Sequence, residues 1–280
     1  MPIKDVLLPL IGEPSAAAIA AIEKCTAVAG DIGARVTAMA VEQDILVRPS
    51  VMTSVDLDNA AAVEEARSVS NAHVLLQVFD TAANRIGVVN DQRLEGLATA
   101  AIAPAIAARA RLKDLSIVPV KPHDDQSEKI VEQLIFESGR PVLMCPVEYA
   151  SELAVAFDHV VIAWDHAAPA ARAVADALPW LQVAASLHII TATDNMTPAE
   201  LESGTALVSH LTEHGIKATF ETIRIDGSAV GKVFEAYIKA NAIDLLVMGA
   251  YRHSRLNEIV WGGATKTVIG RPPCWVMMSH

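Results

Sequence analysis

The chain has 280 residues, of which 52% are hydrophobic and 4% are aromatic, and its formal net charge is −11. This length is enough for two domains of ordinary size. The acidic charge argues against a nucleic-acid-binding protein, which needs a basic face to neutralise phosphates. No apolar run is long enough to cross a membrane, and the opening segment MPIKDVLLPL lacks the pattern of a signal peptide.

The cysteines are few and are not spaced as metal ligands. Cys25, Cys145 and Cys274 lie in apolar surroundings, and no CxxC pair is present. Such a pattern favours buried thiols in the reducing cytoplasm. It also argues against a zinc site, so we expect no metal-binding residues.

The first half alternates apolar strand patterns with helical patterns. Strand patterns cover residues 3–10, 34–41, 86–89, 115–120 and 142–147, and helical patterns cover residues 16–29, 58–79, 92–111 and 127–138. Helices that alternate with buried strands predict a parallel sheet with right-handed crossovers. We expect Pro104 to bend the helix that contains it.

The second half repeats this plan. Four segments match in the same order, namely HVVIAW with DVLLPL, ASLHIIT with ARVTAMA, DLLVMGA with DLSIVPV, and IGRPPCWVMM with SGRPVLMCPV. We therefore predict two copies of one β-α-β-α-β unit, over residues 1–151 and 152–280. In the second copy, Thr197 and Glu200 form a capping box at a helix start, and an alternating strand pattern covers residues 216–223.

The most informative stretch follows the strand pattern over residues 245–248. That strand ends at Gly249, a polar and basic loop follows, and Gly262 and Gly263 then lead into a short helix. A glycine lets the backbone approach a ligand closely, and the free N–H groups at a helix start favour an anion. The order predicts a phosphate-binding site at the carboxyl end of a parallel strand. The alternative is a connection that needs its glycines only to turn.

These residues resemble those of a known family. The chain is similar to a tandem universal stress protein, in which two such domains are fused, and the resemblance is strongest in the second half. The ATP-binding members of that family carry the motif G-x2-G-x9-G-(S/T) between the fourth strand and the last helix. Gly249 matches the first glycine and Gly262 the third, whereas Arg252 replaces the second glycine and Gly263 replaces the Ser or Thr.

The resemblance implies an α/β fold with two tandem domains, each a five-stranded parallel sheet flanked by helices. Both would be of the adenine-nucleotide-binding, Rossmann-like kind and related by a pseudo-two-fold axis. It also implies that the fifth strands, at 142–147 and 274–279, pair within the chain and cover two exposed sheet edges. The result would be an intramolecular pseudo-dimer, with a homodimer of whole chains as a further option.

The resemblance further implies that the second copy binds ATP or a related adenine nucleotide, with or without Mg²⁺. Asp165 follows the first strand and Ile189 follows His188 on the second strand, at positions that contact adenine and ribose in the family. The predicted nucleotide contacts are Asp165, Ile189, Met248, Gly249, Arg252, Gly262, Gly263, Ala264 and Thr265.

Several residues depart from the family pattern. Arg252 either pairs with a phosphate or points to water. The hydroxyl missing at Gly263 could come from Thr265, and Ala167 stands where the family usually has a helix-capping serine. Trp164 either stacks on adenine or fills the pocket.

The first copy lacks the glycine pattern. Residues 121–125 read Lys-Pro-His-Asp-Asp, so a proline removes a donor N–H and two carboxylates repel phosphate. We predict that this degenerate copy binds no nucleotide and serves as a packing partner.

Two other motifs are weaker. Residues 210–214 spell H-x-x-E-H, as in one class of zinc proteases, but histidines at a helix end also favour the helix dipole. Residues 227–232 resemble a P-loop that is one residue short, so Ser228 is predicted to cap a helix instead. No G-x-S-x-G elbow is present, and no catalytic residue is predicted.

Together these features predict a cytoplasmic stress-response protein that binds an adenine nucleotide and an unidentified protein partner. Slow ATP hydrolysis, with Arg252 or His253 near the γ-phosphate, is one alternative, and a nucleotide-free scaffold is another. The sequence shows no general base placed to activate water, so binding is favoured over catalysis.

Overall fold

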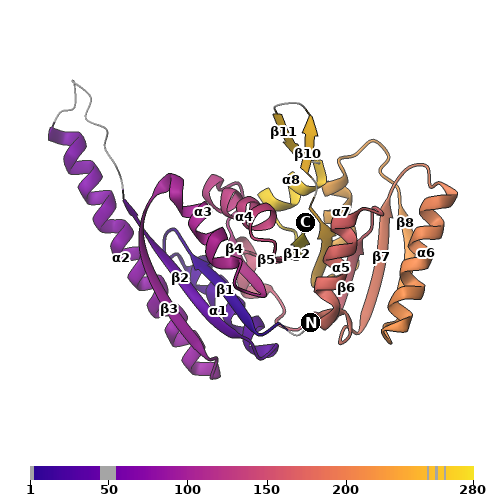
Figure 1. The fold of residues 1–280 in the computed structure, drawn as a ribbon, viewed down its shortest axis with the longest axis horizontal. Helices are drawn as coiled ribbons and strands as arrows, with labels where there is room; N and C mark the ends of the chain where they lie inside the picture. The colour runs from indigo at the N-terminus through magenta and orange to yellow at the C-terminus, as the bar shows by residue number, and fades with distance from the viewer. Residues whose placement is uncertain (1–2, 45–54, 251, 256–257, 262) are drawn as a thin grey trace.

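The computed structural model describes residues 3–44, 55–250, 252–255, 258–261 and 263–280 (Figure 1). The first half contains β1 (Asp5–Leu10), α1 (Ala16–Asp31), β2 (Arg35–Asp44), α2 (Val55–Ile86), β3 (Asn90–Ala98), α3 (Thr99–Ala110), β4 (Leu115–Val120), α4 (Asp125–Glu137), β5 (Val142–Pro146) and a 3₁₀ helix (Val147–Glu152). The second half contains β6 (His159–Ala163), α5 (Ala168–Leu181), β7 (Ser186–Ala192), α6 (Pro198–Glu213), β8 (Thr219–Ile223), α7 (Val230–Ala240), β9 (Leu245–Gly249), β10 (Arg252–Arg255), β11 (Glu258–Trp261), α8 (Gly263–Gly270) and β12 (Trp275–Ser279).

Ten of these strands form one sheet in the order β3-β2-β1-β4-β5-β12-β9-β6-β7-β8. From each outer edge to the centre, both halves run third, second, first, fourth and fifth strand. Neighbouring strands within each half are parallel, as predicted from the alternation of strands and helices. The predicted α/β fold is therefore confirmed.

The two halves meet where β5 and β12 pair. This pair is antiparallel, with Met144 opposite Val276, Leu143 opposite Met277 and Val142 opposite Met278. Every residue of both strands is buried. The predicted pairing of the fifth strands is confirmed, and it covers two apolar edges that would otherwise be open to other chains.

Aromatic side chains in one apolar layer strengthen the junction. The indole nitrogen of Trp275 donates a hydrogen bond to the carbonyl of Ala154 at 3.0 Å. The ring of Phe157 lies between those of Trp180 and Trp275, with centroid distances of 5.6 and 5.8 Å. Because β12 and its flanking residues hold the linker in this way, the junction is part of the folded core.

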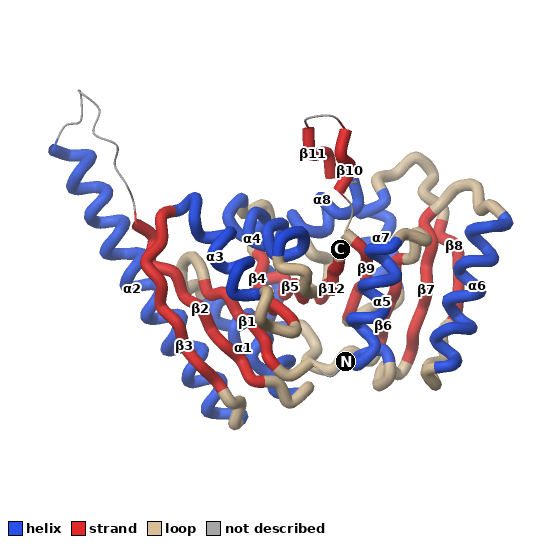
Figure 2. The backbone as a smooth tube through the Cα atoms, in the orientation of Figure 1, coloured by secondary structure: helices blue, strands red, loops and turns tan. Residues whose placement is uncertain are grey.

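Helices cover both faces of the sheet (Figure 2). One apolar layer packs the sheet against α1, α2, α5 and α6, and the other packs it against α3, α4, α7 and α8. Strand β1 shows how one strand serves both layers, because Val6, Leu8 and Leu10 face the first layer while Leu7 faces the second. A strand buried on both faces needs a continuous apolar run, which is what the sequence shows.

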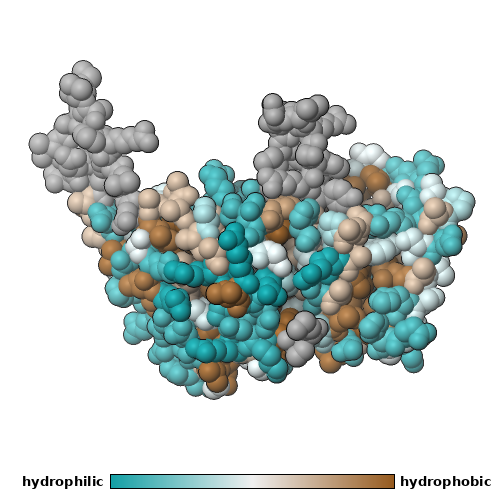
Figure 3. Space-filling view, in the orientation of Figure 1, coloured by the Kyte–Doolittle hydropathy of each residue, from teal (hydrophilic) through white to brown (hydrophobic). Residues whose placement is uncertain are grey.

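Outside these layers the visible surface is mainly hydrophilic, with apolar residues scattered over it (Figure 3). The exposed large apolar side chains come from several separate elements and turns, among them Val63, Val89, Leu112 and Val183. No helix in the described parts of the chain is both long enough and apolar enough to span a bilayer.

Two sequence predictions about local structure are wrong. The predicted strand over residues 86–89 is instead the last residue of α2, Ile86, followed by a turn and loop at 87–89, and the third strand is β3, which begins at Asn90. The helix predicted from Gln92 accordingly begins only at Thr99. Strand β3 lies at the sheet edge and is largely polar, so it has no apolar strand pattern to recognise. Its pairing with β2 determines its conformation instead.

The polar loop predicted after Gly249 is also wrong in part. Residues Arg252–Arg255 form β10, which pairs with β11 in an antiparallel two-stranded sheet. Figure 1 shows these strands standing apart from the large sheet, above the amino end of α8. Hairpin pairing of this kind depends on contacts between the two strands, which the short polar segment does not reveal on its own.

All three thiols are buried and free. Burial, together with the neighbouring Cys145, raises the pKa of the Cys25 thiol, and burial raises the pKa of the Cys274 thiol. The folded thiols of Cys25 and Cys274 therefore stay protonated under conditions in which an unfolded thiol, with a pKa of about 8.5, begins to ionise.

We expect the native protein to leave a thiol-reactive dye unchanged at about pH 8, whereas the protein in denaturant should react at all three cysteines. Because the folded pKa is raised, the free energy of unfolding should fall as the pH rises past about 8.5. Absorbance titration and urea unfolding at several pH values measure both effects. Rapid labelling of the folded protein would contradict the burial of these groups.

Candidate functional site

The candidate site lies at the carboxyl ends of β6 and β9. These strands are neighbours, with Ala163 opposite Met248 at their carboxyl ends. The chain leaves β6 towards α5 on one face of the sheet and leaves β9 towards α8 on the other face. In parallel sheets a reversal of this kind opens a crevice in which ligands bind.

Gly249, which ends β9, is required by the packing of the chain itself. A Cβ atom at this position would lie 2.4 Å from the backbone nitrogen of Ala170 and 2.7 Å from the carbonyl carbon of Pro169. The first turn of α5 therefore rests directly on Gly249. The close approach that the sequence suggested for a ligand is made here by a helix of the same chain.

Asp165 follows β6 and organises the start of α5. Its side chain is exposed, and Oδ1 accepts a hydrogen bond from the backbone N–H of Ala167 at 3.1 Å. Ala167 is the residue before the helix and has no side chain able to cap it. The carboxylate of Asp165 thus sits beside the positive end of the helix dipole.

Trp164 packs towards α6. Its indole nitrogen donates a hydrogen bond to the hydroxyl of Ser203 at 3.1 Å, and its backbone carbonyl accepts one from Thr191 at 2.8 Å. The half-buried ring rests against the apolar layer that also holds α5 and α6. The sequence suggested that Trp164 either stacks on adenine or fills the pocket, and these contacts favour the second role.

Ile189 and Met248 belong to opposite faces of the sheet. Ile189 is fully buried in the layer beneath α5 and α6, whereas Met248 is buried in the layer beneath α7 and α8. Their side chains serve the core, so only their backbone atoms are placed to contact a ligand.

The start of α8 is open. Gly263 is exposed, and a Cβ atom added there would meet no other atom of the described residues within 4 Å. Ala264 is half-buried against the apolar layer, and Thr265 is buried. The carbonyl of Gly263 accepts a hydrogen bond from the Thr267 hydroxyl at 2.8 Å, which fixes the first turn.

Of two further predicted contacts, one is placed only in part and the other is not described. Arg252 begins β10, and its side chain lies outside the described residues, as does the whole of Gly262. The structure therefore brings Asp165, Gly249 and Gly263 to the carboxyl edge of the sheet.

His166 is a candidate that the sequence reasoning missed. Its backbone is left-handed, with φ of 66°, and its ring centroid lies 6.2 Å from that of Trp164. Its Nε2 atom is buried and has no hydrogen-bond partner in the part of the chain that the structure describes. A buried polar atom without a partner is costly, so it marks a place where a ligand or water could bind. A single histidine in a loop carries no sequence signal for this.

The weaker motifs have structural explanations. In the P-loop-like segment, a Cβ atom on Gly231 would lie 2.6 Å from Cγ2 of Thr267, so this glycine lets α7 pack closely on α8. The prediction that Ser228 caps α7 is wrong, because the cap position is Ala229 and no side chain fills it. His210 and His214 stack edge to face at 4.9 Å, and no group of three metal-ligating side chains occurs within the described residues.

Residues 146–280 match the universal stress protein family. Over nearly the whole chain, the fold is similar to a universal stress protein from Archaeoglobus fulgidus DSM 4304, with a TM-score of 0.69, 15% identity, and coverage of 98% of this chain and 97% of that one. A putative universal stress protein from Pseudomonas aeruginosa UCBPP-PA14 gives a TM-score of 0.58 at 13% identity, covering 99% and 93%. No curated protein matches the sequence.

The second half is thus one universal stress protein domain, with the α/β fold of that family. The family match does not reach residues before 146. That the first half is a second such domain, and that the boundary lies at residue 151, remain predictions.

The two glycines at this edge should respond differently to the same substitution. Gly249→Ala should lower the free energy of unfolding by about 1–3 kcal/mol, because its methyl group meets the α5 backbone. Gly263→Ala should leave stability unchanged or raise it by up to about 1 kcal/mol, because the methyl group enters open space on a helix. Urea unfolding followed by circular dichroism compares them. Equal effects would contradict the packing of α5 on Gly249.

Proposed function

We propose that the second half is a stress-response module that binds an adenine nucleotide, with a regulatory rather than a catalytic role. The observation that carries this proposal is the match of residues 146–280 to the universal stress protein family. The glycine motif of the ATP-binding members of that family is retained at Gly249 and Gly262.

The geometry of the carboxyl edge supports an anionic ligand. The start of α8 is exposed at Gly263, and the N–H groups of a helix start favour phosphate. His166 offers a buried ring nitrogen near the start of α5, where it could accept or donate a hydrogen bond. In this proposal the phosphates lie at α8, and His166 contacts the sugar or the base.

Binding without hydrolysis fits the side chains at this edge. A general base must be free to take a proton from water. Asp165 is already engaged with the backbone of Ala167, and its negative charge helps to hold the start of α5. Slow ATP hydrolysis is the second candidate, and a nucleotide-free scaffold is the third, favoured by the packing of Trp164 into the α6 face.

The first half would then act as the fixed partner of the nucleotide-binding half. Its fifth strand pairs with β12, which follows α8 by a short turn. Arg271 in that turn forms an ion pair with Glu148 of the first half at 3.1 Å. A nucleotide that bound at α8 could therefore alter the surface shared by the two halves. The buried free thiols support a cytoplasmic location for such a protein.

Gly263→Asp tests the phosphate end of the proposed site. The carboxylate should repel a bound triphosphate and weaken ATP binding by about tenfold or more, equivalent to roughly 1.4 kcal/mol. It should not destabilise the fold, because an acidic side chain favours a helix start and the position is open. Isothermal titration calorimetry with ATP and Mg²⁺, together with thermal melting, provides the measurement.

Gly263→Ser is the matched control, since it restores the hydroxyl that the family motif carries at this position. It should bind ATP at least as well as the unmodified protein. A phosphate-release assay on the same samples should stay at background. ATP binding that Gly263→Asp leaves unchanged would overturn the proposed site, and steady phosphate release would favour the hydrolase instead.

A further inference from the structure

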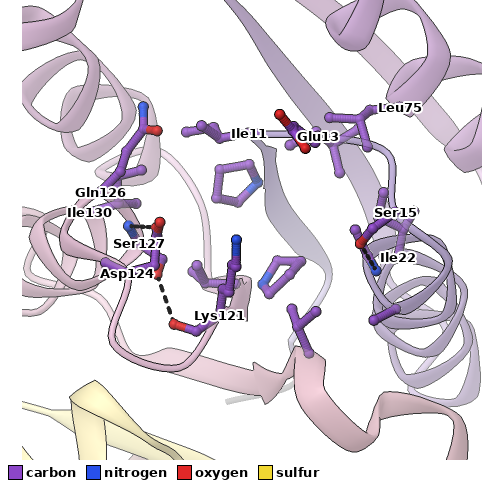
Figure 4. A pocket seen from close by; sticks show the side chains of 18 of the residues that line it. Ile11, Glu13, Ser15, Ile22, Leu75, Lys121, Asp124, Gln126, Ser127 and Ile130 are labelled. Atoms are coloured by element: carbon purple, nitrogen blue, oxygen red, sulfur yellow. Dashed lines mark hydrogen bonds between the residues drawn. The ribbon is translucent and has the colours of Figure 1, made fainter.

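A separate cavity of about 570 Å³ lies in the first half, at the carboxyl ends of β1 and β4 (Figure 4). These strands are neighbours in the sheet, and the helices that follow them, α1 and α4, cover opposite faces. The cavity is thus at the position in the first half where ligands bind in open parallel sheets. Its volume is that of a pocket for a small molecule.

The walls of the cavity are mainly apolar. Leu10 from β1, Ile22 from α1, Leu75 from α2 and Ile130 from α4 all contribute side chains. Three prolines close to the strand ends, Pro9, Pro119 and Pro122, add further apolar surface and supply no N–H donors. A ligand that fills this space therefore needs an apolar body.

Each carboxylate that lines the cavity is already engaged. Glu13 pairs with Arg67 at 2.5 Å, and Glu148 pairs with Arg271 at 3.1 Å. Asp124 accepts a hydrogen bond from the backbone N–H of Ser127 at 2.8 Å and so caps α4.

Two donors in the cavity lack such partners. Within the described residues, no carboxylate lies in ion-pair range of the Lys121 ammonium group, and Figure 4 shows the end of this side chain directed towards the middle of the cavity. The Nε2 atom of Gln126 is buried and has no hydrogen-bond partner among the described residues. The start of α1, at Ser15, also lines the cavity and presents the positive end of its dipole.

We propose that this cavity binds a small amphipathic anion, a monocarboxylate with an apolar body. The carboxylate head pairs with Lys121, and the apolar body lies against Leu10, Ile22, Leu75 and Ile130. One lysine matches one negative charge. A nucleoside triphosphate fits poorly, because its several charges would face three carboxylates and residues 121–125 supply no glycine to cradle phosphates.

The probe is decanoate, a ten-carbon carboxylate, and the full chain is titrated by calorimetry. We expect decanoate to bind, decanol to bind about tenfold more weakly because it lacks the charge, and acetate not to bind because it lacks the apolar body. Absence of decanoate binding at millimolar concentration would overturn the proposal. So would ATP displacing decanoate, which would identify a nucleotide site instead.

Lys121→Met tests the head of the ligand. This change keeps the apolar stem and removes the charge. The affinity for decanoate should therefore fall about tenfold, while the affinity for decanol stays the same. Lys129→Met is the matched control, because Lys129 is exposed on α4 and does not line the cavity. Unchanged decanoate affinity in Lys121→Met would overturn the assignment of the head group.

Ala18→Leu tests the body of the ligand, because Ala18 lines the cavity from the first turn of α1. The larger side chain should lower the affinities for decanoate and decanol to the same extent. Circular dichroism checks that the variant keeps its fold. Gly263→Asp should bind decanoate normally, and Lys121→Met should bind ATP normally, so each proposed site can fail without the other. Equal decanoate binding by Ala18→Leu and the unmodified chain would place the ligand elsewhere.

Discussion

The antiparallel pairing of β5 with β12 is the constraint on which the rest of the structure depends. Both strands are fully buried, and all their residues except Ser279 are apolar, so either half alone would present an unpaired, aggregation-prone sheet edge. Pairing them turns two five-stranded units into one ten-stranded sheet with two continuous apolar layers. The linker packs against the same core, because Phe157 contacts the ring of Trp275 and the Trp275 indole donates a hydrogen bond to the carbonyl of Ala154. The two halves therefore share one core, which links the packing of each half to that of the other.

Glycine positions at the carboxyl edge show why a sequence motif and a binding site are not the same thing. Gly249 and Gly231 are both required because another helix approaches within van der Waals distance. Gly263 has open space around it among the described residues, so no packing contact within that part of the chain explains it. All three appear in stretches that resemble phosphate-binding motifs. Only the surroundings of each glycine separate a packing role from a role that a ligand could fill.

The sequence predicted the elements whose signal is local. Continuous apolar runs located β4 and β9, and the capping box at Thr197 located the start of α6. It missed β3, which is an edge strand defined by its pairing with β2, and it missed the β10–β11 hairpin for the same reason. The unpartnered nitrogen of His166 and the first-half cavity depend on segments that are distant in the sequence, so no local pattern could reveal them.

The same strand order supports different chemistry in the two halves. The register of β1 with β4 and of β6 with β9 places Val6 and Val160 at corresponding positions, opposite Leu115 and Leu245. Beyond these strands, the second half has an exposed glycine at a helix start, whereas the first half has prolines, engaged carboxylates and one lysine facing an apolar space. A helix start with free N–H groups favours a multiply charged anion, and a single ammonium group among apolar walls favours a singly charged amphipathic one. Because the shared sheet is fixed by its buried layers, the loops at its carboxyl edges are where the two halves are free to differ.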